Sequence, residues 1–121
     1  MSDAELYERA VAAAERAYAP YSNYLVGAAA LMRDGTVLEG VNVENAAYPL
    51  GACAERTALS GAVVAGYRPG DVEAVAITAS PCGGCRQWLY EFKVDRVVYP
   101  SGGALVARTP AELLPDTWDE L

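Results

Sequence analysis

Apolar residues follow two different periods along this chain, and the change from one period to the other predicts where helices and strands lie. A helical repeat that includes Leu6 and Ala17 follows the capping box formed by Ser2 and Glu5. We expect this helix to stop before Pro20, because a residue that precedes proline avoids helical backbone angles. Further helices are expected over residues 53–65, over residues 81–92 and from Pro110.

The strand-like segments lie between these helices. A turn at residues 33–36 joins the first two of them as a hairpin. Helices that alternate with strands predict an α/β protein, in which layers of helix pack on a mixed sheet. At 121 residues the chain is expected to form one domain, residues 1–121. The expected strands are residues 25–32, 37–41, 72–78, 96–99 and 104–107.

Charge narrows the range of partners. The net charge is −7, so a nucleic acid or an anionic membrane would meet a repulsive field. The N-terminus lacks the pattern of a secretory leader, and no apolar run approaches the ~20 residues of a membrane helix. We therefore expect a cytoplasmic protein, and in that reducing compartment its three cysteines are thiols or metal ligands.

Cys53, Cys82 and Cys85 all lie at expected helix starts, where free N–H groups favour the thiolate. A structural zinc site takes four Cys or His ligands, but this sequence has three Cys and no His. The fourth position must go to water or to a carboxylate, and an open water position is what catalytic zinc requires. The cysteines therefore predict a catalytic metal site.

Glu55, two residues after Cys53, is placed to stand beside such a metal and to transfer protons. Taken alone, Cys53 is as well explained as a small buried apolar residue, and Cys82 with Cys85 suits redox chemistry equally. Taken together, Cys-Ala-Glu followed by Pro-Cys-Gly-Gly-Cys matches the signature of zinc deaminases.

Around these motifs the chain resembles the small homotetrameric cytidine deaminases over nearly its whole length. The resemblance implies a three-layer α/β/α fold with a mixed five-stranded sheet and one zinc ion per subunit. It also implies a homotetramer with active sites at subunit interfaces, acting on a nucleoside in pyrimidine salvage. The activity implied is hydrolysis of cytidine or deoxycytidine to uridine or deoxyuridine and ammonia, with Glu55 moving the protons. The matching segments are residues 19–24, 26–29, 42–45, 53–56, 85–87 and 113–115.

The same resemblance implies a set of substrate-binding residues. Asn42 and Glu44 would bind sugar hydroxyls, since side chains two positions apart on an extended segment project to one side. Without the resemblance, both residues are better explained as turn residues after a strand. Tyr24 takes the place of the family's stacking Phe, and the Ala54 N–H would bind the pyrimidine carbonyl. Tyr48 would reach a neighbouring subunit's pocket. Trp118 replaces the Phe that usually follows Leu-Leu-Pro.

Three thiolates on one zinc ion leave an excess negative charge, which weakens the metal as a Lewis acid. Arg56 is the best-placed side chain to withdraw that charge by donating hydrogen bonds to sulfur, and Arg86 is a second candidate. For Arg86 a surface ion pair of little energetic value is an equally good explanation.

Three other functions remain open. One is deamination of another aminopyrimidine-like compound, such as the nucleoside antibiotic blasticidin, although residues 42–45 favour a ribose-bearing substrate. Residues 79–80 form a shorter loop than the family usually has at the pocket rim, which leaves the fine substrate preference open. The second is thiol–disulfide exchange by Cys82 and Cys85, which leaves Cys53 and Glu55 unexplained. The third is a zinc-binding module without activity, against which the intact Glu55 speaks.

Overall fold

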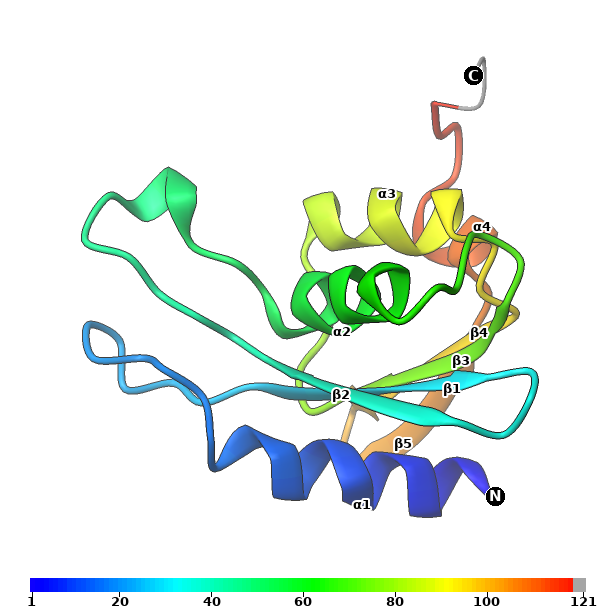
Figure 1. The fold of residues 1–121 in the computed structure, drawn as a ribbon, viewed down its shortest axis with the longest axis horizontal. Coiled ribbons are helices and arrows are strands. Elements are labelled where there is room, and N and C mark those ends of the chain that lie inside the picture. Colours follow the sequence, from blue (N-terminus) through cyan, green and yellow to red (C-terminus); the bar gives the residue numbers. More distant parts are fainter. Residues whose placement is uncertain (119–121) are drawn as a thin grey trace.

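A computed structural model describes residues 1–118, which form a five-stranded sheet with helices on both faces (Figure 1). The strand order is β2-β1-β3-β4-β5. The β3–β4 pair is parallel and the other neighbours are antiparallel, so the predicted mixed sheet is confirmed. In chain order the elements are α1 (Asp3–Ala14), β1 (Gly27–Met32), β2 (Val37–Val41), the 3₁₀ helix η1 (Tyr48–Leu50), α2 (Ala54–Val64), β3 (Val72–Ile77), α3 (Gly83–Glu91), β4 (Arg96–Ser101), β5 (Ala104–Arg108) and α4 (Pro110–Leu113).

The first layer is α1, which covers one face of the sheet alone (Figure 1). Leu6 and Ala10 of α1 pack against alternate residues of the central strands, among them Ala29, Ala74 and Val98. Most of these side chains are alanine, so the helix lies close to the sheet. The capping box expected at the start of α1 is present, since the Ser2 side chain accepts the Glu5 N–H and the Glu5 side chain accepts the Ser2 N–H.

The opposite face of the sheet carries α2, α3 and α4, which completes the predicted three-layer arrangement (Figure 1). The larger core lies here. Leu59 of α2 and Leu89 of α3 are fully buried in it, together with Val75 and Ile77 of β3 and Val97 of β4. Both α2 and α3 start at the same end of the sheet, which brings residues 53 and 82–85 side by side.

Two glycines let helices approach the sheet more closely than any side chain would permit. A Cβ on Gly27 would lie 2.0 Å from the Ala10 carbonyl oxygen of α1. A Cβ on Gly40 would lie 2.4 Å from both the carbonyl oxygen of Ala54 and the amide nitrogen of Ala58, in α2. These glycines therefore fix the depth of one helix on each face.

Several element boundaries differ from the sequence prediction. The first helix ends at Ala14 instead of running on towards Pro20, because the backbone of Tyr18 leaves it to pair with the segment after β2. The Tyr18 N–H donates to the Asn42 carbonyl at 3.0 Å, and the Glu44 N–H donates to the Tyr18 carbonyl at 2.8 Å.

Within residues 1–118, no helix has both the length and the apolar character needed to cross a bilayer.

Candidate active site

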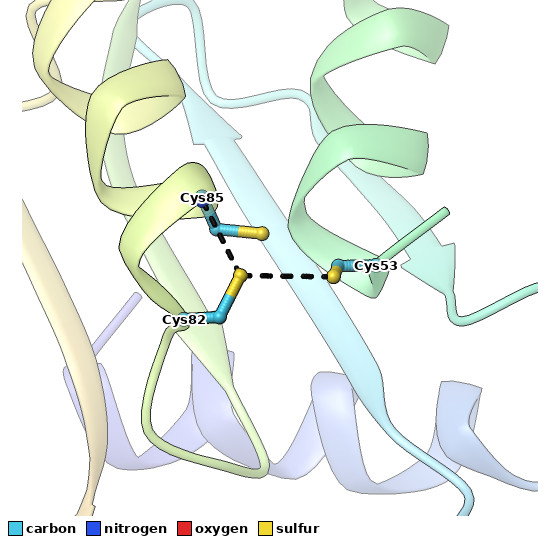
Figure 2. Close-up of side chains that lie close together, drawn as sticks. All are labelled: Cys53, Cys82 and Cys85. Atoms are coloured by element: carbon cyan, nitrogen blue, oxygen red, sulfur yellow. Dashed lines mark hydrogen bonds between the residues drawn. The ribbon is translucent and has the colours of Figure 1, made fainter. Parts of the chain in front are cut away.

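The three cysteine sulfurs form one cluster between the starts of α2 and α3 (Figure 2). All three Sγ atoms lie within 4.8 Å of one another, and those of Cys53 and Cys82 are 3.9 Å apart. The structure therefore brings together residues that are up to 32 positions apart in the sequence, as the motifs predicted.

Each sulfur is held by the end of a helix. Cys53 is the N-cap of α2 and Cys82 is the N-cap of α3, and both have extended backbone angles. Cys85 lies one turn further along α3 and is fully buried, and its N–H donates to Cys82 Sγ at 3.5 Å. Pro81 and Cys82 precede α3 instead of belonging to it, which corrects its predicted start. Two helix N-termini thus direct partial positive charge at the sulfurs.

The cluster fits a zinc ion. Tetrahedral zinc binds thiolate sulfur at about 2.3 Å, which places two such ligands about 3.8 Å apart. The spacing of 3.9 Å between Cys53 and Cys82 is close to that value. Since the sequence holds no other cysteine and no histidine, three sulfurs leave one position of a tetrahedral ion open.

The opposite pKa shifts of Cys53 and Cys85 also favour a bound cation. Hydrogen bonding with Cys85 lowers the pKa of Cys53 to about 6, with smaller help from Cys82 and Arg56. The same hydrogen bond, together with burial, raises the pKa of the Cys85 thiol far above its usual range. One thiolate therefore forms readily, and a second beside it needs a compensating positive charge.

Glu55 lies in the first turn of α2 and is 3% exposed, the one charged residue buried to this degree among residues 1–118. Burial raises the pKa of its carboxyl group above the ordinary value, against the opposing effects of its own backbone N–H, Cys85 and Arg56. A carboxyl group whose pKa is shifted towards neutrality is suited to both accept and release a proton.

Arg56 reaches the sulfurs, as the sequence predicted. Its Nη2 lies 3.8 Å from Cys82 Sγ, and its contact with Cys85 raises the pKa of the guanidinium group. The guanidinium packs on the first turn of α3, where a Cβ at Gly84 would lie 2.7 Å from Nη2. Its buried Nε has no hydrogen-bond acceptor among residues 1–118, so the position of Arg56 beside the sulfurs costs some free energy of folding.

Arg86 has a different role from the one expected. Its Nε donates to the Pro81 carbonyl at 2.9 Å, its Nη1 to the Leu113 carbonyl at 2.9 Å, and its Nη2 to Ser80 Oγ at 3.3 Å. All three nitrogens of the guanidinium are thus directed at oxygen atoms instead of the sulfurs. Arg86 fastens the segment before α3 to α4, and it is neither a charge-withdrawing group nor a surface ion pair.

A pocket of about 180 Å³ opens beside the cluster. Six residues singled out from the sequence belong to its wall, and Ile77 of β3 adds to it together with Ala79 and Ser80 of the short loop. Ala54 is the first residue of α2, where N–H groups lack an acceptor within the helix. The six are Tyr24, Asn42, Cys53, Ala54, Glu55 and Cys82.

Asn42 holds the loop that carries Tyr24. Its Oδ1 accepts the Val26 N–H at 2.8 Å, and its Nδ2 donates to the Tyr24 carbonyl at 2.9 Å. One N–H of the amide remains for a ligand. Because Val26 uses its N–H in this way, β1 begins at Gly27 and not at the predicted residue 25.

Glu44 and Tyr48 do not line the pocket at the cysteines. They belong to a separate pocket of about 320 Å³, together with Tyr21, Ser22 and Asn45. Tyr48 is 79% exposed and is the first residue of η1, which lies in the segment between β2 and α2 that projects beyond the sheet (Figure 1).

Trp118 is 67% exposed, and its carbonyl accepts a hydrogen bond from Gln87 Nε2 of α3 at 3.4 Å. Gln87 also accepts a hydrogen bond from the Thr117 hydroxyl at 2.8 Å, which ties the end of the described chain to α3. The structure therefore places Trp118 outside the pocket wall of its own chain.

Two residues that support the site were not predicted from the sequence. Thr57 Oγ1 accepts the Val41 N–H at 2.9 Å and donates towards carbonyl oxygens of Val41 and Ala54, so it ties the start of α2 to β2. Ser22 binds the Glu44 carboxylate. Threonine on a helix and serine in a turn are too common for either position to stand out in a single sequence.

Known proteins resemble this chain in sequence and in fold. Residues 1–101 match the family described as the cytidine and deoxycytidylate deaminase zinc-binding region. A cytidine deaminase from Halalkalibacterium halodurans is 47% identical over 119 residues, which span 91% of this chain and 89% of that protein. The crystal structure of cytidine deaminase from Burkholderia pseudomallei has a TM-score of 0.90 at 46% identity, with 98% of this chain and 100% of that one covered. That from Mycobacterium tuberculosis has a TM-score of 0.85 at 36% identity, with 98% of both chains covered.

The motif and the sulfur cluster are consistent with these similarities, which cover most of the chain. This chain belongs to the cytidine and deoxycytidylate deaminase zinc-binding family.

Proposed function

We propose that this chain is a zinc-dependent cytidine deaminase, which hydrolyses cytidine or deoxycytidine to uridine or deoxyuridine and releases ammonia. The observation that carries the proposal is the sulfur cluster with an open fourth position beside the buried Glu55, in one pocket wall. Cys53, Cys82 and Cys85 would hold the zinc ion. When bound there, zinc would lower the pKa of a water molecule and so make it nucleophilic at neutral pH.

Glu55 performs the proton transfers. Its carboxylate accepts one proton from the attacking water and delivers it to the ring nitrogen. It then takes the second proton of that water, from the hydroxyl now bonded to the ring carbon, and gives it to the departing amine. One water is thus consumed for each ammonia released, and the carboxylate is regenerated. Burial supports this role, because it brings the pKa of the group closer to the pH at which it must both gain and lose a proton.

Other residues of the pocket, together with Glu44 of the neighbouring pocket, orient the nucleoside. The free N–H of Ala54 binds the pyrimidine carbonyl, and the ring of Tyr24 stacks on the base. Asn42 and Glu44 bind sugar hydroxyls, and the remaining N–H of Asn42 supports this assignment. Arg56 offsets the charge of the thiolates.

We also propose that the active unit is a homotetramer with active sites at subunit interfaces, in the cytoplasm, in pyrimidine salvage. The exposure of Tyr48 and Trp118 supports the interface, since two large rings stand outside the pocket of their own chain. In a second subunit's pocket both rings would be shielded from water, as aromatic side chains of this size usually are.

An ultraviolet assay of cytidine, deoxycytidine, cytosine and blasticidin tests the proposal, before and after zinc is removed with a chelator. We expect turnover of one or both pyrimidine nucleosides, loss of turnover on chelation, and recovery when zinc is restored. Zinc in the purified protein, measured by elemental analysis, should approach one ion per chain.

Two results would contradict the proposal. Turnover of blasticidin without turnover of either pyrimidine nucleoside would favour the alternative substrate. Protein that lacks zinc, exchanges disulfides and does not deaminate would favour the redox alternative, although the shared cluster of all three cysteines speaks against it.

A further inference from the structure

Ser22 lies in the turn between α1 and β1, next to a residue with unusual backbone angles. Asn23 has a φ of 59°, in the left-handed region that asparagine tolerates better than most residues. Its N–H donates to the Ala19 carbonyl at 3.0 Å, which closes the turn. The turn is therefore a defined structure that presents Ser22 in one direction.

The Ser22 hydroxyl has two partners. Its Oγ donates to Oε2 of Glu44 and accepts the N–H of Tyr24 at 3.0 Å. Glu44 belongs to the segment after β2, whereas Tyr24 belongs to the loop before β1. One hydroxyl thus joins a carboxylate and an aromatic residue that are 20 positions apart in the sequence.

The same hydroxyl connects the two pockets. Tyr24 lines the pocket beside the cysteines, and Ser22 and Glu44 line the neighbouring one. Any shift of Glu44 relative to Tyr24 would change the spacing between a group for the base and a group for the sugar, and the Ser22 hydroxyl resists such a shift.

Glu44 is nearly saturated with hydrogen bonds from this turn. Its Oε1 accepts the N–H groups of Tyr21 at 3.0 Å and of Ser22 at 3.1 Å, and its Oε2 accepts the Ser22 hydroxyl. A carboxylate has about four acceptor sites, so one remains, on Oε2. The direction of that last site is set by the Ser22 hydroxyl on the same oxygen.

The turn does not depend on Ser22 alone. Asn42 holds the adjoining residues through the Val26 N–H and the Tyr24 carbonyl, and the backbone N–H groups of Tyr21 and Ser22 still reach Glu44 without the hydroxyl. Removal of the hydroxyl should therefore disturb alignment more than folding.

We propose that Ser22 is a positioning residue for nucleoside binding: its hydroxyl aligns the Glu44 carboxylate with Tyr24 so that one sugar hydroxyl and the base are bound together. This inference rests on the proposed function. It predicts a defect that depends on the sugar hydroxyls of the substrate.

The test compares cytidine with 2′,3′-dideoxycytidine, which keeps the base but lacks both ring hydroxyls. For Ser22→Ala we expect KM for cytidine to rise about tenfold, the order expected when a hydrogen bond to a charged group is lost, with kcat within about twofold. For the dideoxy compound kcat/KM should match that of the wild type. The ratio of kcat/KM for the two substrates, measured in one preparation, is unaffected by any inactive fraction.

Ser22→Thr keeps the hydroxyl and should restore KM for cytidine. The matched control is Ser101→Ala, which removes an exposed serine at the β4–β5 turn. An equal loss on both substrates, or no loss on either, would overturn the role of Ser22. Failure of the wild-type protein to deaminate cytidine would instead overturn the proposed function.

Discussion

Cys85 and Glu55 are buried, whereas Tyr24 and Tyr48 are 61% and 79% exposed to solvent. The metal cluster, defined as Cys53, Cys82 and Cys85 with Glu55, lies where two helices begin over the main core. The recognition loops, residues 15–26 and 42–52, run side by side beyond the same end of the sheet (Figure 1).

The two regions are held in place by different forces. Packing of α2 and α3 on the sheet fixes the metal cluster, so its geometry follows from the core. The recognition loops are fixed by backbone N–H groups that donate to the side chains of Glu44 and Asn42, and by Asn42 Nδ2, which donates to a backbone carbonyl. Their aromatic rings are left in solvent. The residues of the metal cluster therefore all come from one chain, while the proposed homotetramer would complete substrate recognition with residues of a second subunit.

The largest predicted effect is a loss of turnover that leaves the metal cluster intact. Glu55→Gln keeps the size of the side chain but removes its capacity to carry a proton, so kcat for cytidine should fall by roughly 10²–10⁴-fold. Zinc content, measured by elemental analysis, should stay near that of the wild type. A variant that deaminates at close to the wild-type rate would contradict the role of Glu55.

A matched pair of arginine variants separates charge withdrawal from structural support. Arg56→Ala should retain most of its zinc and lose about 10–100-fold in turnover, since Arg56 contacts the sulfur of Cys82. Arg86→Ala should act mainly on stability, with the free energy of unfolding lower by about 1–3 kcal/mol, because it leaves buried carbonyl groups without a donor. Kinetics and denaturant unfolding of both variants measure the difference; identical behaviour of the two would refute it.

The smallest effect lies in the recognition loops. Loss of a stacking ring in Tyr24→Ala should raise KM for cytidine by about 2–10-fold and leave zinc content unchanged. Tyr24→Phe keeps the ring and serves as the control, with KM expected close to that of the wild type. If Tyr24→Ala loses zinc, the two regions are not independent and the comparison fails.

Local signals in the sequence were sufficient for much of the fold. The capping box at Ser2 is present as predicted, and the helix expected from Pro110 begins there behind a second capping box at Thr109, because each depends on residues within one helical turn. The cysteines of the cluster were found because two short motifs, each carrying its own spacing, imply a common metal.

What the sequence could not reveal depends on pairings between distant segments. The early end of α1 follows from backbone hydrogen bonds of Tyr18 to Asn42 and Glu44, and no residue near position 14 signals it. Arg86 was misjudged for a related reason, since its partner Leu113 lies 27 residues further along the chain. Adjacency to Cys85 suggested contact with the sulfurs, but neighbours on a helix point in different directions.

Gly40 limits which substitutions this protein can accept during evolution. Zinc sites tolerate errors of about 0.2 Å in ligand distance, and Cys53 is carried at the start of the helix whose depth Gly40 sets. Any larger residue at position 40 would lift α2, and no adjustment of a side chain could restore the backbone contact. Substitution is therefore closely restricted at a residue with no functional group, 13 positions before Cys53.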